Sequence, residues 1–199
     1  MEQRFEQALG TLQKHLLDAS GDFKISIRFA LIGGLAMSAW GVVRATADID
    51  LLAHSDPSPL RNPGLRDRMK RFLEARACTV EWRTGDPDDP IPLLLRVGVP
   101  SPKLALEADV LWAHKRWQGE ALRRAVILKL SEMDVPVLHP EDLILLKLEA
   151  GGPQDLLDVE GLLLESPPNF DISRLKEKAS RLRLDVALEK LLRRGRSLK

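Results

Sequence analysis

The pattern of apolar and polar positions divides the chain into a first part with alternating strands and helices and a second part with helices only. An amphipathic helical pattern comes first, and the apolar run in GDFKISIRFALI, residues 21–32, predicts a strand that enters the core. LAMSAWG, which follows Gly33-Gly34, has room only for a short helix. Further strands are predicted in ATADIDLLA (45–53), CTVEWRT (78–84), IPLLLRVGV (91–99) and KLALEADVLW (103–112), with a basic helix over about 65–77.

From His114 onward the periodicity becomes helical. HKRWQGEALRRAV (114–126) has helical spacing, and VPVLHP (135–140) is a short extended piece. PEDLILLKLEAGG begins with Pro140 and ends with a Gly pair, which are start and stop signals of a helix. Two more helical stretches, 153–166 and 171–195, complete the chain. We therefore expect an α/β (α+β) fold, in which a mixed-sheet core over residues 1–135 is followed by a C-terminal helical subdomain over 136–199.

Composition narrows the class of protein. The 199 residues suit one domain with at most a small appendage, and 44% hydrophobic residues can form a core. A net charge of +1 and the absence of tyrosine argue against a non-specific nucleic-acid binder or a stacking platform for single strands. The single cysteine, Cys78, excludes an internal disulfide. No apolar run approaches membrane-spanning length and the start does not resemble a signal peptide, so we expect a cytoplasmic protein without membrane contact.

Two carboxylates stand in the second predicted strand, where burial would make their repulsion worse. Side chains alternate between the faces of a strand, so Arg44, Thr46, Asp48 and Asp50 share one face and the apolar residues of 45–51 share the other. Neighbouring carboxylates need a counter-charge, and Mg²⁺ or Mn²⁺ prefers such oxygen ligands. The alternative is an edge strand whose acidic side chains face water.

Three features around this strand favour a metal site near a bound anion such as a phosphate. Gly33-Gly34 lies between a strand and a short helix, where backbone N–H groups can approach a phosphate. Ser38, together with Arg44 and Thr46, adds donors between the glycines and the acids. A later strand has an apolar face and carries Glu107 and Asp109 on its other face, which supplies the third carboxylate that a pair of metal ions needs.

With these residues, the sequence resembles the polymerase-β-type nucleotidyltransferase superfamily. The shared pattern is a Gly-Gly pair, a short helix, R-x-T-x-D-I-D-L and a later D-V-L strand. Within the superfamily, the chain is similar to small bacterial proteins of the abortive-infection toxin kind. PEDLILLKLEAGGPQDLLDVEGLL (140–163) resembles the segment of those proteins in which a lysine and two aspartates follow the sheet, so the likeness covers roughly residues 28–163.

The resemblance implies Mg²⁺- or Mn²⁺-dependent transfer of a nucleotidyl group from an NTP such as ATP to an acceptor hydroxyl. It implies that Asp48 and Asp50 are metal ligands, that Asp109 is a third ligand or the base, and that Gly33 and Gly34 contact the triphosphate. The chain departs from the pattern at Gly34, because many toxins of this type have serine there. A hydroxyl near the phosphates must then come from Ser38 or Thr46.

The first helical segment after the sheet carries further candidates. Lys147 interrupts the apolar stretch LILLKLEA, so it either extends to water or contacts a phosphate or the acidic cluster. Asp155 follows Pro153 at a helix start, where a carboxylate complements the helix dipole. Asp158 lies one turn later, and both an ion pair with Lys147 and a catalytic role are open.

The acceptor is left open by the sequence. An RNA end suits the basic helices and the toxin likeness, and a protein hydroxyl suits an enzyme that modifies itself or an antitoxin. A small antibiotic-type acceptor calls for an acidic cleft, and the only acidic run outside the core is GDPDDP, residues 85–90. A non-catalytic nucleotide-binding or interaction protein that retains the fold is the alternative from another class. The toxin likeness also implies a toxin–antitoxin or phage-defence role with a cognate antitoxin as partner.

Overall fold

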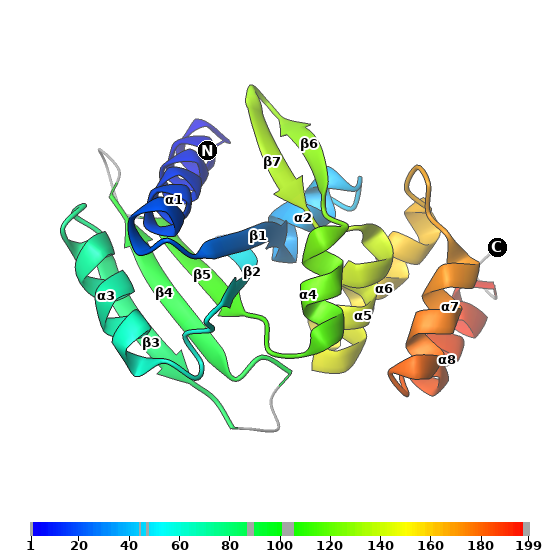
Figure 1. The fold of residues 1–199 in the computed structure, drawn as a ribbon. Helices are drawn as coiled ribbons and strands as arrows, with labels where there is room; N and C mark the ends of the chain where they lie inside the picture. Colours follow the sequence, from blue (N-terminus) through cyan, green and yellow to red (C-terminus); the bar gives the residue numbers. More distant parts are fainter. Residues whose placement is uncertain (1, 44, 47, 87–89, 101–105, 197–199) are drawn as a thin grey trace.

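Seven strands form one mixed sheet at the centre of the molecule (Figure 1). The computed structural model describes residues 2–43, 45–46, 48–86, 90–100 and 106–196. The strands are β1 Ser26–Ile32, β2 Ile49–Asp56, β3 Thr79–Thr84, β4 Leu93–Val99, β5 Leu106–Trp112, β6 Val126–Leu130 and β7 Met133–Val137. They lie in the order β3-β4-β5-β2-β1-β7-β6.

Two strand pairs are parallel and the others are antiparallel. β2 runs parallel to β5, and β1 runs parallel to β7. The antiparallel pairs are β1–β2, β3–β4, β4–β5 and β6–β7. The prediction of an α/β fold with a mixed sheet and C-terminal helices is therefore confirmed. The proposed domain boundary after residue 135 stays a prediction; the last strand ends at Val137.

Helices precede, interrupt and follow the sheet. They are α1 Glu2–Phe23, α2 Gly33–Ala39, α3 Pro63–Glu74, α4 Arg116–Arg123, α5 Pro140–Ala150, α6 Pro153–Glu165, α7 Ile172–Arg181 and α8 Asp185–Arg196. In the part of the chain that the structure describes, none of these helices combines the length and apolar character of a membrane span.

Local sequence signals explain where several helices begin and end. The Asn62 side chain accepts a hydrogen bond from the Leu65 N–H at the start of α3, and Asp171 caps α7 in the same way. Pro140 occupies the first turn of α5, where its missing N–H costs nothing. Gly151 ends that helix with a φ of +66°, which glycine adopts without strain.

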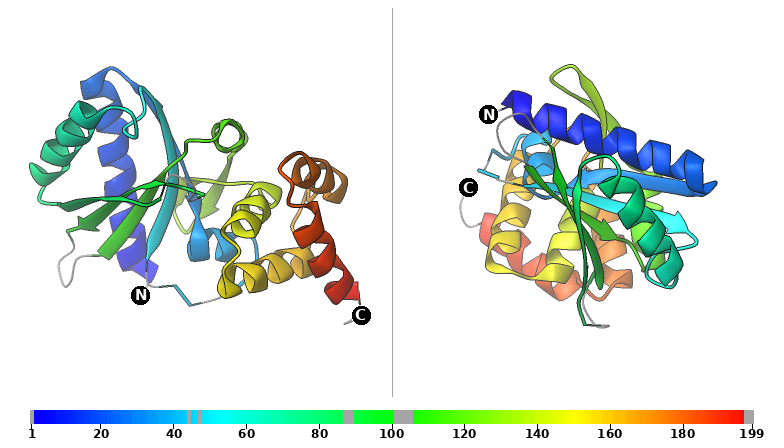
Figure 2. Two further views of the ribbon diagram at one scale, coloured as in Figure 1. Left: turned by 90° about the horizontal axis from the view of Figure 1, so that it is seen from below. Right: turned by 90° about the vertical axis from the view of Figure 1, so that its left-hand side faces the viewer.

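The two faces of the sheet have different cover. One face carries fully buried side chains such as Leu51, Leu95 and Val110, over which α1 and α3 pack (Figure 2). On the other face, α4 packs against β1 and β2, and the His54 ring lies against Gly119. Helices α5–α8 lie on the other side of the molecule from α1 and α3 (Figures 1 and 2).

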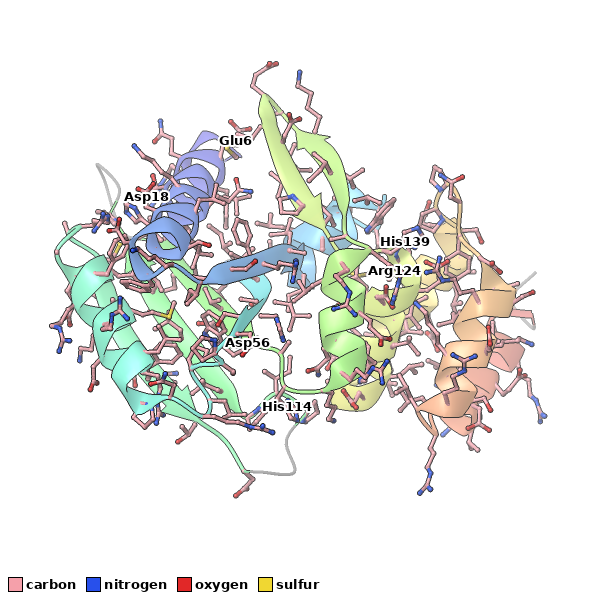
Figure 3. All side chains as sticks on the ribbon, in the orientation of Figure 1. Glu6, Asp18, Asp56, His114, Arg124 and His139 are labelled. Carbon is pink, nitrogen blue, oxygen red and sulfur yellow. The ribbon has the colours of Figure 1, made fainter. Side chains whose placement is uncertain are left out.

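A buried charge cluster holds α5 against its neighbours. The fully buried Asp142 carboxylate accepts hydrogen bonds from Arg124 at 2.8 and 2.9 Å and from Lys178 at 2.8 Å. Glu141 accepts a hydrogen bond from the Asp171 N–H at 2.8 Å and pairs with His139. Figure 3 labels Arg124 and His139 of this cluster. These partners lie partly before α5 and partly at or in α7. The hydrogen bonds therefore connect the start of α5 to the segments that precede it and to α7.

Two local predictions are wrong. β2 begins at Ile49, so Thr46 and Asp48 precede the strand. Strand alternation therefore applies to Asp50 but not to Thr46 or Asp48, which were predicted to share its face. The helical pattern over 114–126 ends early, because α4 stops at Arg123 and Val126 begins β6. Val126 and the residues after it form a strand because they pair with β7 in antiparallel fashion. Such tertiary contacts can override the local preference for a helix.

Candidate active site

The site is assembled where β1 ends, β2 begins and β5 runs beside β2. Ile32, the last residue of β1, is the register partner of Asp50, and Asp50 is the parallel register partner of Asp109. Neighbouring strands lie about 4.8 Å apart, and register partners point to the same face. Asp50 and Asp109 are therefore neighbouring residues on the less covered face of the sheet, as the alternation within β5 predicts for Asp109.

Gly33 makes room for the Asp50 carboxylate. Its φ is +63°, and a Cβ atom added to it would lie 2.0 Å from Oδ2 of Asp50. Glycine is thus required here by both the backbone conformation and the close approach of a side chain. Gly34 is buried inside α2. The Gly-Gly pair therefore sets the turn from β1 into α2 directly beside the acidic residue.

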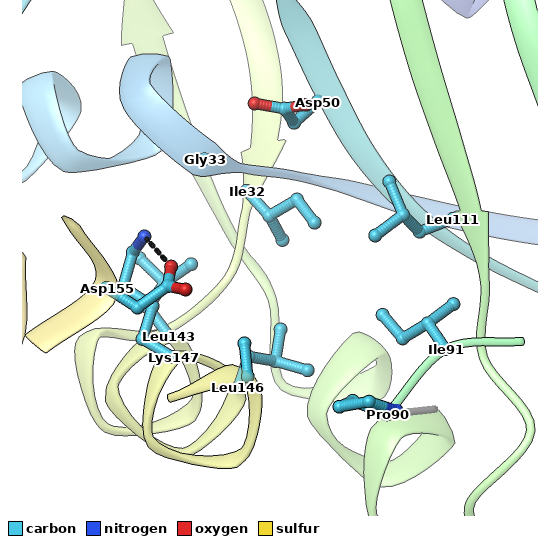
Figure 4. A pocket seen from close by; sticks show the side chains of 11 residues that line it. Ile32, Gly33, Asp50, Pro90, Ile91, Leu111, Leu143, Leu146, Lys147 and Asp155 are labelled. Atoms are coloured by element: carbon cyan, nitrogen blue, oxygen red, sulfur yellow. Dashed lines mark hydrogen bonds and ion pairs between the residues drawn. The ribbon is translucent and has the colours of Figure 1, made fainter. Parts of the chain in front are cut away.

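A cavity of about 330 Å³ opens beside Asp50 and Gly33 (Figure 4). Its wall is largely apolar, formed by Ile32, Pro90, Ile91, Leu111, Leu143, Leu146 and Ala150. Its polar groups are Asp50, Lys147 and Asp155. An apolar wall with a few converging polar groups is typical of small-molecule sites of this size.

Lys147 is a buried cation at the polar end of this cavity. Its side chain is only 9% exposed, and its Nζ lies 3.2 Å from Oδ1 of Asp155 (Figure 4). The same Nζ lies 2.5 Å from Oδ2 of Asp158. Asp158 is itself buried and also accepts a hydrogen bond from Gln154 at 3.0 Å. The sequence left open both an ion pair with Lys147 and a catalytic role for Asp158, and the structure shows the ion pair.

The remaining predicted residues lie at different distances from the cavity. Asp48 is exposed just before β2, and the Thr46 hydroxyl donates to its carbonyl at 3.3 Å. The Ser38 hydroxyl donates to the Gly34 carbonyl at 3.1 Å and lines a separate cavity beside α1 and β7. Arg44 lies outside the described residues. The structure therefore brings Gly33, Asp50, Lys147 and Asp155 together and does not bring Ser38 to them.

Arg96 on β4 is a site residue that the sequence interpretation missed. Its Nε donates to Oδ1 of Asp109 at 2.8 Å and its Nη2 donates to Oδ2 at 2.7 Å. These hydrogen bonds and the negative charge of Asp109 raise the pKa of Arg96. The available signal was a single arginine within the otherwise apolar strand PLLLRVGV.

Gln118 is a second missed residue, and it acts on the cavity wall. It is fully buried; its side-chain oxygen accepts hydrogen bonds from the N–H groups of His114 and Lys115, and its amide donates to the Pro90 carbonyl at 3.0 Å. Because Pro90 and Ile91 line the cavity, Gln118 holds that part of the wall in place.

The donor set suits a hard divalent cation, because Asp50 and Asp109 supply carboxylates from register partners on neighbouring strands. Asp109 currently uses both oxygens on Arg96. Within the described ranges, no three or more His, Cys, Asp or Glu side chains are grouped so that they could hold an ion. The metal-ligand roles of Asp48, Asp50 and Asp109 accordingly stay predictions.

The segment that leads to Asp48 rests on α6. A Cβ atom at Gly161 would lie 2.8 Å from Cγ1 of Val42, so the absence of a side chain lets the two segments meet. The helical part of the chain thus contacts the connection between α2 and β2 as well as the cavity.

Comparison with known proteins gives the class and then the family. A family model described as a nucleotidyl transferase matches residues 15–196, so the protein is of the nucleotidyltransferase class. The chain belongs to this family, the nucleotidyl transferase AbiEii toxins of type IV toxin–antitoxin systems. A search of curated proteins found no match.

Solved structures with a similar course of the chain include other nucleotidyltransferases. An antigenic nucleotidyltransferase-like protein from Paracoccidioides brasiliensis is 17% identical, with 94% of this chain and 93% of that chain covered and a TM-score of 0.49. The antibiotic-resistance factor ANT(2'')-Ia is 16% identical, with 98% and 96% covered and a TM-score of 0.44. The lincosamide antibiotic adenylyltransferase LnuA is 12% identical, with 76% and 94% covered and a TM-score of 0.41.

Proposed function

We propose that this toxin-family protein transfers a nucleotidyl group from an NTP to an acceptor hydroxyl and releases pyrophosphate. The observation that carries the proposal is the cavity in which Asp50, Gly33 and Lys147 meet an apolar wall. The apolar wall suits a nucleoside, and a buried ammonium group suits its phosphates. Family membership supports the same reaction class and implies a cognate antitoxin.

The proposed roles of the residues follow from their places. Lys147 binds and orients a phosphate at the polar end of the cavity, and Gly33 leaves space for Asp50 beside it. Asp48, Asp50 and Asp109 hold Mg²⁺ or Mn²⁺. A divalent ion held by these carboxylates would supply positive charge against the phosphates. Catalysis of this kind depends mainly on positioning and charge stabilisation, and the protein provides both through these side chains.

The acceptor belongs to the proposal, and RNA is the candidate that a specific observation favours. Helices α7 and α8 present many basic side chains and few acidic ones, which attracts a polyanion. The exposed basic residues between Ile172 and Arg194 are Lys176, Arg181, Arg183, Lys190, Arg193 and Arg194, whereas Lys178 is held by the buried Asp142.

Labelling distinguishes the acceptors. The protein is incubated with each of the four α-³²P NTPs, Mg²⁺ and total cellular RNA. We expect label in RNA; label in the protein itself indicates a protein hydroxyl. Absence of label from both supports the non-catalytic alternative, and absence of Mg-ATP binding in calorimetry then favours an interaction protein over a nucleotide-binding one. A panel of small aminoglycoside-like acceptors tests the antibiotic-type alternative.

Asp50→Asn is expected to reduce transfer by about a hundredfold or more, because it removes a charge that the proposal places against the metal ion and phosphates. The substitution preserves side-chain shape, so we expect little change in the melting temperature. Asp67→Asn, on the exposed surface of α3, removes the same charge elsewhere and should retain activity. Initial rates of label incorporation check the result, and full activity of Asp50→Asn would contradict the proposed mechanism.

A further inference from the structure

Arg96 is surrounded by carboxylates on the less covered face of the sheet. Besides the two hydrogen bonds to Asp109, its Nη1 lies 3.7 Å from Oε2 of Glu107. Asp48 also attracts it electrostatically. Two of these three carboxylates, Asp48 and Asp109, are residues to which the proposed function assigns the metal.

The guanidinium and a metal ion require the same atoms. Asp109 binds Arg96 through both of its oxygens, in the two-pronged geometry that makes arginine–carboxylate pairs strong. A divalent cation that took Asp109 as a ligand would also lie close to the positive charge of Arg96. Asp109 therefore cannot keep both hydrogen bonds to Arg96 and also bind a divalent metal ion without a large cost in free energy.

We propose that Arg96 is a built-in counter-cation that competes with the divalent metal for Asp109. The proposal rests on the proposed function, because that function calls for the metal. Arg96 neutralises the carboxylates when no metal is bound and turns away from Asp109 when the metal binds. It is a positioning residue for Asp109, and it lowers the affinity of the protein for the metal.

The surroundings of Arg96 permit this movement. Its side chain is 29% exposed, and the Glu107 side chain is 59% exposed. The guanidinium can thus leave Asp109 toward water without entering the core, and Glu107 remains within its reach. Breaking the ion pair of a partly exposed arginine that has a second carboxylate nearby costs less than breaking the fully buried Asp142 cluster.

Binding of Mn²⁺ to the full chain, measured by electron paramagnetic resonance without nucleotide, tests the proposal. Loss of the guanidinium frees both oxygens of Asp109 and removes a positive charge that would lie beside the ion. We therefore expect Arg96→Gln to lower the Kd for Mn²⁺ by at least about tenfold. Lys70→Gln, which removes one exposed positive charge on α3, should leave the Kd unchanged.

The outcomes separate the proposal from the proposed function. An unchanged or higher Kd in Arg96→Gln, with Mn²⁺ binding to the wild type that Asp50→Asn weakens, overturns the competition and leaves the metal site intact. No Mn²⁺ binding by either the wild type or Arg96→Gln overturns the competition and the metal part of the proposed function together. If Arg96→Gln does not fold, Arg96→Lys, which loses the two-pronged contact, should bind Mn²⁺ more tightly than the wild type; equal or weaker binding overturns the competition.

Discussion

Replacing Gly33 with alanine is expected to reduce nucleotidyl transfer by about a hundredfold, because the new methyl group and the Asp50 carboxylate cannot occupy the same space. The added Cβ atom would lie 2.0 Å from Oδ2 of Asp50 and 2.7 Å from its Cγ. Either Asp50 moves or the turn between β1 and α2 changes, and both displace a side chain that the proposed reaction needs.

The same substitution should also lower stability. A residue other than glycine at a φ of +63° is strained, and we expect a loss of about 1–3 kcal/mol in the free energy of unfolding. Gly21→Ala is the matched control, because its Cβ atom would meet nothing within 4 Å and it lies in α1. Urea unfolding and initial rates check both effects. Wild-type activity in Gly33→Ala would show that the position of Asp50 beside Gly33 has no part in the reaction.

Lys147→Met is expected to lower the free energy of unfolding by about 3–5 kcal/mol, because it leaves the buried Asp158 carboxylate without its cation. The Lys147 side chain is 9% exposed and the Asp158 side chain is 2% exposed, so water cannot replace the lost partner. Lys70→Met on α3 is the control. Lys70 lies 3.8 Å from Glu74 and both side chains are largely exposed, so its loss should cost less than about 1 kcal/mol.

A double variant separates the structural role of Lys147 from its proposed role with phosphate. Adding Asp158→Asn to Lys147→Met removes the unpaired buried charge and should restore most of the lost stability. Binding of ATP, measured by calorimetry at equal folded protein, should remain lost in the double variant. Recovery of stability and ATP binding together would assign Lys147 a structural role only.

Strand periodicity and local helix signals predicted several features of the fold and the site correctly. The alternation of apolar residues in β5 correctly separated Asp109 from Ala108 and Val110, both of which are fully buried. Helix signals also sufficed at α5, where Pro140 and Gly151 mark its two ends. These features depend on neighbours within a few residues, which the sequence shows directly.

The errors and omissions concern contacts between segments far apart in the chain. β6 forms by pairing with β7, and helical spacing in the preceding residues hid it. The sequence interpretation missed Arg96, because its partner Asp109 lies on β5 and the register between β4 and β5 is not visible in the sequence. The ion pair of Lys147 with Asp158 is one of the two alternatives that the sequence leaves open, because both residues lie within one short stretch.

The sequence by itself determined the local chemistry of this protein: a Gly-Gly turn, a pair of aspartates after it, a third on a later strand and a lysine in an apolar helix. The tertiary structure alone decided that Asp50 lies against Gly33, that Asp109 is held by Arg96 and that Lys147 closes the polar end of a cavity. The physical reason is that alternation and capping act over a few residues, whereas strand register and the packing of α5 against the sheet bring together segments separated by many tens of residues.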